Sequence, residues 1–186
     1  MIVPIATVNM LAGVLTVAAQ VAVLFLALAL VLERRGGLRS FVSLVERRVL
    51  QLSFAASLAA VLGSLYYSEI VGYEPCILCW WQRVFKYPQV LIAGIALWKN
   101  DRHALRYLMA LSAVGATIAG YHYLLEWGLI PSGFCPATGP NCAQRFVYEF
   151  GYITIPLMSL TAFAMSFLIA FAGRERHAVD PSPSDR

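Results

Sequence analysis

The sequence predicts an all-α integral membrane protein with five transmembrane helices. Its 186 residues are 60% hydrophobic and only 13% charged, about half of the roughly 25% that gives a soluble domain its hydrated surface. The mean hydropathy is +0.69. The few charges are also unevenly placed, because long uncharged runs alternate with short basic connections. An ordinary soluble domain is therefore excluded.

Uncharged runs predict where the helices lie. Each reaches or approaches the roughly 20 residues that a helix needs to cross the hydrocarbon core of a membrane. A fifth stretch, 77–98, is long enough but contains Arg83 and Lys86 near its start. A soluble bundle would need polar helix faces that these stretches lack. The four runs without a charged residue are 1–32, 49–68, 107–125 and 150–173.

The first run is interpreted as a retained transmembrane helix rather than a signal peptide. It has no basic segment in front of it, and it is much longer than the roughly 7–15 apolar residues of a signal peptide. The chain is then expected to have four parts. These are an extra N-terminal transmembrane helix (1–32), a basic cytoplasmic segment (33–48), a four-helix bundle (49–173) and a cytoplasmic tail (174–186).

Two structures are open for the basic segment 33–48. In a short interfacial helix, Leu38, Phe41, Val42 and Val45 would share one apolar face. The alternative is a solvated linker between the first and second transmembrane helices, and the sequence does not decide between them.

Positive charge predicts the orientation of the helices, because arginine and lysine stay on the cytoplasmic side of short connections. Segments 33–48 and 99–106 and the C-terminal tail are rich in them. Connections 69–75 and 126–149 hold only one basic residue, Arg145. Five spans then place the N-terminus outside and the C-terminus inside. The rule also accounts for the net charge of +4, which gives no indication of a nucleic-acid partner.

All four cysteines are expected at the outer face of the membrane. Cys76 and Cys79 open the third span, whereas Cys135 and Cys142 lie in the loop before the last span. Disulfides persist on the oxidising side of a membrane. An even number of cysteines there favours disulfide chemistry over metal binding.

The first pair has the pattern of a redox-active motif. Pro75 suits the first turn of a helix, where its missing N–H is not needed. Cys76 and Cys79 would then lie in the first turns, near the positive end of the helix dipole, which stabilises a thiolate. A disulfide across a CxxC closes a small ring that constrains the unfolded chain little. The pair is therefore better suited to thiol–disulfide exchange than to stabilising the fold.

The second pair is open to two interpretations. Pro136, Gly139 and Pro140 allow the chain between the two cysteines to fold back, so Cys135 and Cys142 could form a disulfide. That disulfide would either tie the outer loop or take part in thiol exchange.

Metal and haem sites are less consistent with the pattern. Four cysteines could ligate one zinc ion, but the outer location and the lack of paired ligand motifs around the second pair argue against a metal. A c-type haem needs a histidine directly after the CxxC, where Trp80 stands.

Arg83 is a candidate functional cation. It follows Cys79 by four residues and therefore lies on the same helix face. A fixed cation there would stabilise a thiolate and any acceptor that becomes anionic. Lys86 is instead expected to reach the headgroups with its long side chain. Trp81 and its aromatic neighbours either belong to the interfacial belt or form a wall for a flat aromatic ligand.

His122, near the outer end of the fourth span, is either hydrogen-bonded between helices or a donor to a ligand oxygen. Thiol–disulfide exchange can carry electrons from an external protein to the loop pair and on to the CxxC, and the path must end at a two-electron acceptor. No nucleotide-binding motif such as GxGxxG is present. By elimination, the acceptor expected at this depth is a lipid-soluble quinone.

Several blocks of the sequence resemble one known family. They are GSLYYSEI (63–70), EPCILCWWQR (74–83), YP (87–88), HYL (122–124), the Cys135/Cys142 loop and GYITIP (151–156). Together they resemble the DsbB family of disulfide-bond formation proteins, most closely its Gram-positive BdbC branch, over about residues 49–172. CxxC alone is a weak motif, but CxxC followed by an arginine and a later cysteine pair is specific.

The resemblance implies a DsbB-like four-helix transmembrane bundle in a bacterial cell (inner) membrane. Its expected activity is that of a quinone-dependent protein disulfide oxidoreductase. Such an enzyme reoxidises a DsbA- or BdbD-like thioredoxin-fold thiol oxidase outside the cytoplasm and uses ubiquinone or menaquinone. The expected roles are Cys79 facing the quinone, Cys76 as its disulfide partner, Cys135 in the mixed disulfide with the oxidase, Cys142 completing the loop disulfide, and Arg83 and His122 near the quinone.

Two features depart from the family pattern. The first span, 1–32, is additional, and no catalytic role is expected for it. The short spacing between the loop cysteines leaves the order of exchange in the loop open. The alternatives are an enzyme like vitamin K epoxide reductase, in which the loop cysteines precede the CxxC, and a non-enzymatic membrane protein with two structural disulfides.

Overall fold

The computed structural model describes residues 4–33, 38–131, 133, 135 and 139–179. Within these residues the chain is helical and contains no β-strand beyond one isolated bridge between Glu149 and Ile153. A π-helical turn, Tyr66–Ile70, continues α3. The helices are α1 (Ile5–Glu33), α2 (Arg39–Arg47), α3 (Val49–Leu65), α4 (Ile77–Lys99), α5 (Leu105–Glu126) and α6 (Ile155–Val179).

Long apolar helices confirm the prediction of an all-α, multi-pass membrane protein. Among the described residues, four helical stretches are long and apolar enough to cross a membrane. α4 is also long enough, at 23 residues, but it carries Arg83 and Lys86 within its span. The four stretches are Ile5–Leu32, Val49–Ile70, Arg102–Glu126 and Ile155–Arg174.

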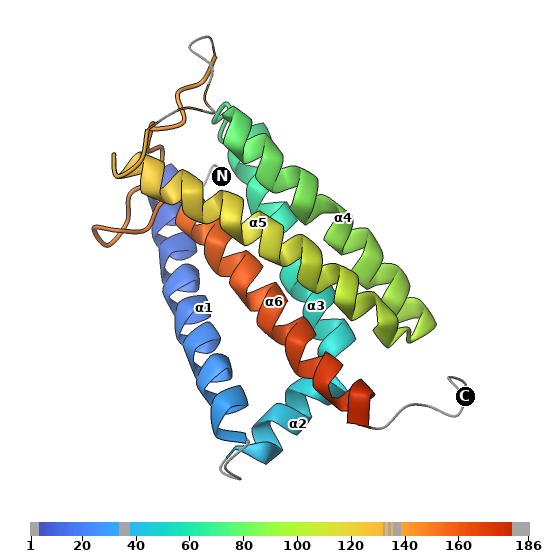
Figure 1. The fold of residues 1–186 in the computed structure, drawn as a ribbon. Helices are drawn as coiled ribbons and strands as arrows, with labels where there is room; N and C mark the ends of the chain where they lie inside the picture. Colours follow the sequence, from blue (N-terminus) through green and yellow to red (C-terminus); the bar gives the residue numbers. More distant parts are fainter. Residues whose placement is uncertain (1–3, 34–37, 132, 134, 136–138, 180–186) are drawn as a thin grey trace.

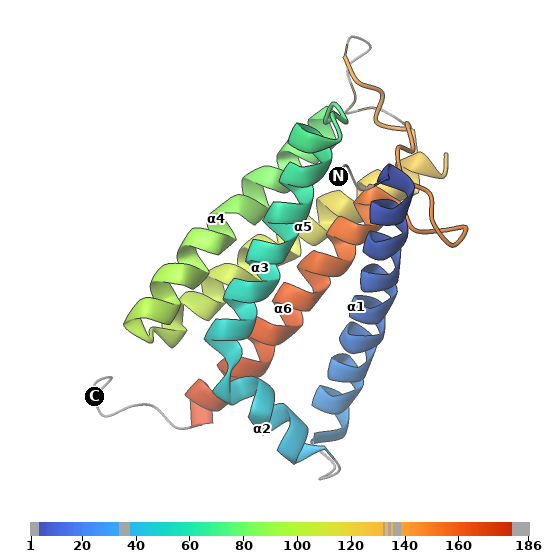
Figure 2. The same ribbon diagram turned by 180° about the vertical axis from the view of Figure 1, so that it is seen from behind.

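The centre of the bundle is the pair α5 and α6, which pack along each other (Figure 1). Gly115 of α5 makes the close approach possible, because a Cβ atom there would lie 2.2 Å from the ring of Phe163 in α6. α4 packs on α5, and α3 packs on α4 and α6. Figure 2 shows α1 on the far side of α6 from α4. Most of the other helices therefore pack against α6.

The additional helix α1 is joined to the bundle by α2. This short connection is a helix rather than a linker, with Val42 and Val45 buried and the ring of Phe41 4.9 Å from that of Phe25 in α1. α2 also packs on α6. Polar contacts hold α1 further along its length, since Gln20 lies 3.4 Å from the hydroxyl of Thr161 in α6.

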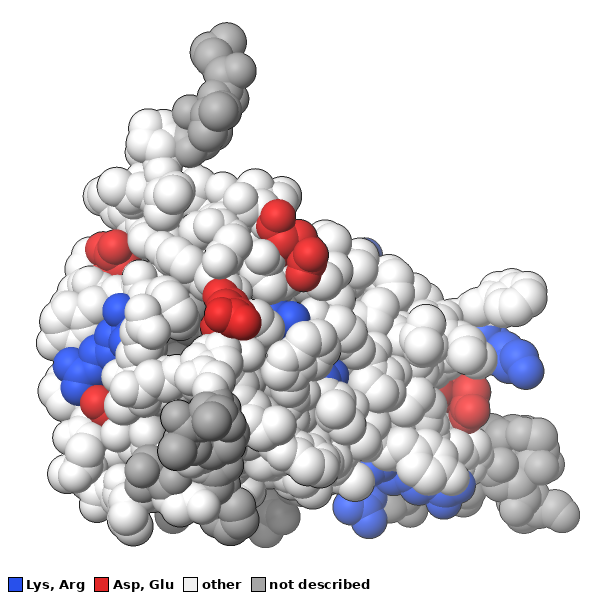
Figure 3. All heavy atoms as spheres, turned by 90° about the horizontal axis from the view of Figure 1, so that it is seen from above, with Lys and Arg blue, Asp and Glu red and all other residues white. Residues whose placement is uncertain are grey.

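The bundle has two ends of different charge. The cysteine end consists of the end of α3, the start of α4, the end of α5 and the start of α6. Seen from there, separate acidic side chains lie on a mostly uncharged surface (Figure 3). The basic end comprises α2 and the α4–α5 connection. Its basic side chains include Arg39, Arg47, Arg48, Lys99, Arg102 and Arg106.

Candidate functional site

Cys76 occupies the N-cap of α4, just before the helix rather than within its first turn, where it was predicted. Its backbone is extended (φ −70°, ψ 171°), and the helix itself begins at Ile77. The Cys76 carbonyl oxygen already accepts the first helical hydrogen bond, from the N–H of Trp80 at 3.1 Å. An N-cap residue combines these two features. Pro75 therefore precedes the helix instead of starting it, and the Cys76 sulfur lies at the positive end of the helix dipole.

The sulfurs of the CxxC are close but not bonded. Sγ of Cys76 lies 3.3 Å from Sγ of Cys79, and both cysteines are free thiols. The pKa of Cys76 is lowered to about 4, chiefly by the hydrogen bond with the Cys79 thiol, while burial opposes the shift and His122 contributes to it. The reduced motif thus favours a thiolate on Cys76.

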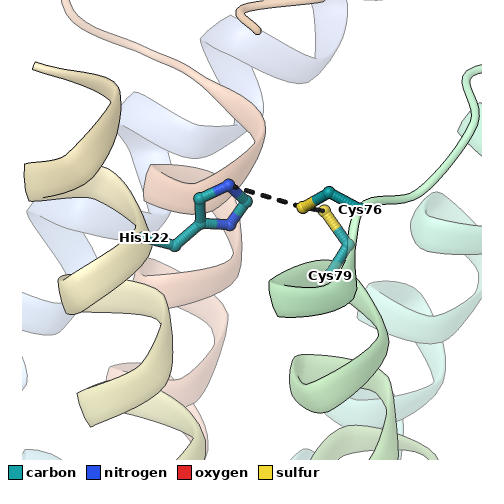
Figure 4. Close-up of side chains that lie close together, drawn as sticks. All are labelled: Cys76, Cys79 and His122. Carbon is teal, nitrogen blue, oxygen red and sulfur yellow. Dashed lines mark hydrogen bonds between the residues drawn. The ribbon is translucent and has the colours of Figure 1, made fainter. Parts of the chain in front are cut away.

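His122 reaches toward this pair from the neighbouring helix α5 (Figure 4). Its side chain is only 2% exposed, and its Nε2 atom lies 3.7 Å from Sγ of Cys76. The same Nε2 lies 3.0 Å from the carbonyl oxygen of Cys142. A carbonyl oxygen only accepts hydrogen bonds, so Nε2 carries the proton. Nδ1 then accepts from the side-chain amide of Gln82 at 3.0 Å.

The loop cysteines, Cys135 and Cys142, form a disulfide. Cys142 is 2% exposed, whereas Cys135 is half-buried. Both belong to the same apolar cluster as Cys76 and Cys79, together with Leu125 at the end of α5. The structure therefore brings the two cysteine pairs together, with His122 contacting a member of each.

A metal site is the competing use of these groups. The ligand atoms of Cys76, Cys79 and His122 lie within 4.8 Å of one another. Both ring nitrogens of His122 already have partners, however, so ligation would have to displace one of them. The disulfide between Cys135 and Cys142 also removes those two sulfurs as thiolate ligands. The groups fit thiol exchange better than zinc.

Behind the CxxC lies a mostly apolar cavity of about 420 Å³. Among the described residues, Cys79 lines it and Cys76 does not. Its walls come from α1, α3, α4 and α6. The two sulfurs of one motif thus face different surroundings. On α4 the lining side chains are Cys79, Gln82, Arg83, Lys86 and Tyr87.

Arg83 is fixed at the wall of this cavity. Its Nε donates to Oγ of Ser64 at 3.1 Å, and one terminal nitrogen donates to the Ser64 carbonyl oxygen at 3.3 Å. The guanidinium also lies 5.1 Å from the ring centre of Trp80. These contacts hold a permanent positive charge beside the space that Cys79 faces.

Lys86 does not extend to the headgroups, and that prediction was wrong. Its side chain is buried, and Nζ donates to Oγ of Ser166 at 2.7 Å and to the carbonyl oxygen of Ala162 at 3.2 Å. The ammonium also lies 4.8 Å from the ring centre of Phe163. α6 therefore supplies enough acceptors for the charge to stay inside the bundle.

Tyr87 is one of the aromatic residues that the sequence left open between the interfacial belt and the wall of a flat ligand. Its hydroxyl is buried and has no hydrogen-bond partner among the described residues. Tyr87 lines the cavity and lies one helical turn beyond Arg83 on the same face of α4. The four-residue spacing from Arg83 therefore indicated that the two side chains share one surrounding. By contrast, His122 and Trp81 are not among the described residues that line the cavity, and Trp81 is 50% exposed. Of the three residues predicted to bind a quinone, only Arg83 is among the described residues that line this cavity.

α1 contributes to the cavity although no role in the site was expected for it. Its lining residues are mostly small, which is common in transmembrane helices and gives no specific signal in the sequence. The α1 residues concerned are Ala12, Leu15, Thr16 and Ala19.

Comparisons with known proteins agree on one family. The family model described as "Disulfide bond formation protein DsbB" matches residues 46–173. The "Disulfide bond formation protein C" of Bacillus subtilis (strain 168) is 42% identical over 117 residues, covering 62% of this chain and 85% of that protein. The "SPbeta prophage-derived disulfide bond formation protein B" of the same organism is 41% identical over 116 residues, which cover 62% of this chain and 78% of its own length.

A relative outside Bacillus matches over a similar region. The "Probable disulfide formation protein" of Metapseudomonas resinovorans is 36% identical over 130 residues, covering 69% of this chain and 90% of the relative. No solved structure gives a significant match. The region that matches the family begins after α1, so α1 lies outside it.

Proposed function

The chain belongs to the DsbB family of disulfide bond formation proteins, and we propose that it passes electrons from an extracytoplasmic thiol oxidase to a membrane quinone. The oxidase would be a DsbA- or BdbD-like protein with a thioredoxin fold. One observation carries the proposal. Cys79 faces an apolar cavity, whereas Cys76 faces His122 and the loop disulfide, so one motif connects two separate reaction sites.

Electrons enter through the loop. The two thiols of the partner reduce the Cys135–Cys142 disulfide, so the partner gains a disulfide and the loop gains two thiols. The loop thiols then reduce a Cys76–Cys79 disulfide and become oxidised again. The arrangement in the structure, with the loop oxidised and the CxxC reduced, corresponds to the state after this second exchange.

The cavity suits a ring with polar oxygens and an apolar body. Most of its lining is apolar, Arg83 supplies a fixed cation, and the Tyr87 hydroxyl is a buried donor without a partner among the described residues. A buried polar group without a partner is destabilising, so a ligand oxygen that accepts from Tyr87 would relieve it. A bound ubiquinone or menaquinone would supply an acceptor for two electrons and two protons. Oxidation of the Cys76 and Cys79 thiols to a disulfide releases those electrons and protons.

The charges at the two ends support the proposed orientation. The basic end carries the arginines and lysines that stay in the cytoplasm, and the cysteine end carries acidic residues, including Glu69, Glu74 and Glu149. The cysteines would therefore lie on the extracytoplasmic side of a bacterial cell membrane. The N-terminus of α1 lies near the cysteine end and would also be outside (Figure 1).

Quinone reduction by the detergent-purified protein tests the proposal. The donor is a reduced thioredoxin-fold oxidase, and the loss of quinone absorbance is followed for the wild type and for Cys79→Ser. We expect rapid reduction by the wild type and none above background by the variant. A correctly folded wild type that reduces neither ubiquinone nor menaquinone would favour a non-enzymatic protein with structural cysteine pairs.

A further inference from the structure

We propose that α1 completes the quinone site by holding the isoprenoid tail of the quinone between its small-residue face and α3. The inference rests on the proposed function and extends it to the helix that lies outside the family match. It assigns α1 a binding role and names the part of the ligand that it contacts, a polyprenyl chain.

The α1 residues at the cavity form one continuous helix face. Ala12, Thr16 and Ala19 follow one another at intervals of four and three residues, as positions on the same side of a helix do. The hydroxyl of Thr16 donates to the carbonyl oxygen of Ala12 at 2.7 Å, so it presents little polarity to the cavity. Leu15 also lines the cavity, so this face is apolar and mostly small.

α3 presents a second small-residue face to the same cavity. It consists of Ala56, Ala59, Ala60, Gly63 and, nearest the Arg83 side chain, Ser64. Small residues usually let transmembrane helices approach closely, yet α1 packs on α6 and α2 and not extensively on α3. The two faces therefore line a gap instead of a helix–helix contact.

Specific contacts fix the position of α1 relative to the rest of the bundle. At the cysteine end, the hydroxyl of Tyr67 donates to Oδ1 of Asn9 at 3.2 Å. Gly13 lies close to the side chain of Glu149, where a Cβ atom would be 3.1 Å from the Glu149 Cβ atom. Further along, Gln20 is held by Thr161 and accepts from the hydroxyl of Tyr152 at 2.9 Å. α1 is thus positioned by the core on both sides of the cavity-lining residues.

The cavity has a polar side and an apolar side. Cys79 and Arg83 of α4 supply the sulfur and the charge, whereas the side chains that line it from α1 and α3 are mostly small and apolar. From Asn9 to Ala19 the helix advances about 15 Å at about 1.5 Å per residue, so Ala19 lies well away from the cysteine end. A ligand with a polar ring and an apolar chain matches this distribution, with the chain in the gap between α1 and α3.

The test uses two adjacent alanines of α1. Ala19 lines the cavity, whereas Ala18 is exposed and does not. Ala19→Phe should fill the gap, and Ala18→Phe is the matched control. Quinone binding is measured as the rise in melting temperature on adding a quinone with a short isoprenoid tail or the same ring without a tail, and as the quinone retained through purification.

We expect Ala19→Phe to bind the tailed quinone about tenfold more weakly than the wild type, because the buried methylenes of the tail supply that affinity. Its affinity for the tail-less ring should stay the same, and Ala18→Phe should match the wild type with both. Ala12→Leu on the same face is the milder variant if Ala19→Phe does not fold, with the same expected direction.

Two results would overturn the inference, and they differ from a failure of the proposed function. If the cavity variants bind the tailed quinone as tightly as the wild type, α1 does not hold the tail. The same conclusion follows if their affinity for the tailed quinone and for the tail-less ring falls equally. If the wild type itself binds neither quinone, the proposed function is wrong and the inference with it.

Discussion

The Nε2 atom of His122 lies 3.7 Å from the Sγ atom of Cys76, in the buried space between α4 and α5. Because Nε2 also contacts the carbonyl oxygen of Cys142, His122 connects the helix motif to the loop that carries the second disulfide. Stabilising the Cys76 thiolate stabilises the reduced motif, and a disulfide whose reduced form is stabilised is a stronger oxidant. This arrangement favours electron flow from the loop to the CxxC.

Reactivity of Cys76 in the reduced protein should therefore persist to acid pH. Its pKa is lowered to about 4, chiefly by the hydrogen bond with the Cys79 thiol. In the folded protein the Cys76 thiolate is therefore present down to a pH of about 4. Its stabilisation of the reduced folded protein is complete above the ordinary thiol pKa, and it is lost as the pH falls through about 4. Alkylation of Cys76 by iodoacetamide, followed against pH by mass spectrometry, should show this low midpoint.

Cys79→Ala is the informative comparison for that titration. It removes the largest cause of the lowered pKa, so the midpoint of Cys76 alkylation should move upward. His122→Ala should move it in the same direction by less. Equal midpoints in the wild type and Cys79→Ala would contradict the assignment.

Cys135 should be the entry point for electrons from the partner protein. It is the more exposed cysteine of the loop disulfide, whereas Cys142 is buried. Cys135→Ser should abolish quinone reduction driven by the partner but retain reduction driven by dithiothreitol, which can reach the CxxC directly. Both rates are measured from quinone absorbance.

Cys142→Ser provides the matched control for the entry point. With Cys135 unable to re-form the loop disulfide, a mixed disulfide with the partner should accumulate and appear on a non-reducing gel. The same complex formed by Cys135→Ser would reverse the roles of the two loop cysteines.

Charge-free runs predicted the helices well because an apolar run of that length has few other stable structures in a membrane. The ends of the helices were less accurate. The run beginning at residue 150 becomes helical only at Ile155, because Phe150 and Gly151 both have positive φ angles and form a turn. Such a turn depends on the local backbone rather than on the hydropathy of the run.

The candidate site was only partly predictable. The spacing of Arg83 from Cys79 along one helix indicated a shared face, and both do line the cavity. The surroundings of Lys86 depend on hydrogen-bond acceptors of α6 that lie about 80 positions away in the chain. The residues next to Lys86 in the sequence therefore do not predict these contacts. The contribution of α1 also depends on how α2 returns the chain to the bundle.

Arg83→Ala should impair quinone use more than folding. The guanidinium is held at the cavity by Ser64, and losing one such electrostatic contact to a reacting group lowers a rate by about 10²–10³-fold. The kcat/KM for quinone should fall on that scale, while the melting temperature changes little. Arg106→Ala, at an exposed arginine of the basic end, is the control, and unchanged quinone kinetics in Arg83→Ala would refute the role.

Tyr87→Phe should weaken quinone binding without destabilising the protein. The hydroxyl is buried and has no protein partner, so its removal breaks no internal hydrogen bond and relieves an unfavourable burial. Loss of one hydrogen bond to a ligand oxygen is worth about 0.5–1.5 kcal/mol, which raises the quinone Kd severalfold. The Kd is measured by thermal shift, and an unchanged Kd would show that the hydroxyl does not contact the ligand.

Gly115→Ala should destabilise the bundle where α5 meets α6. A Cβ atom at this position would lie 2.2 Å from Cε1 of Phe163, and that phenylalanine is fully buried. Forcing an extra carbon into a packed core costs about 1–3 kcal/mol. The free energy of unfolding, measured with denaturant in detergent, should fall by that amount.

Gly120→Ala separates packing from helix propensity. Gly120 lies on the same helix, but a Cβ atom there meets nothing within 4 Å. Alanine is a better helix former than glycine by about 1 kcal/mol, so this variant should be as stable as the wild type or more so. If the clash with Phe163 is the cause, Phe163→Leu should cost less stability in the Gly115→Ala background than in the wild type, because the smaller side chain makes room for the added methyl group. Additive effects of Gly115→Ala and Phe163→Leu would instead show that the two residues are not coupled, and that the close approach of α5 to α6 does not depend on the missing Cβ.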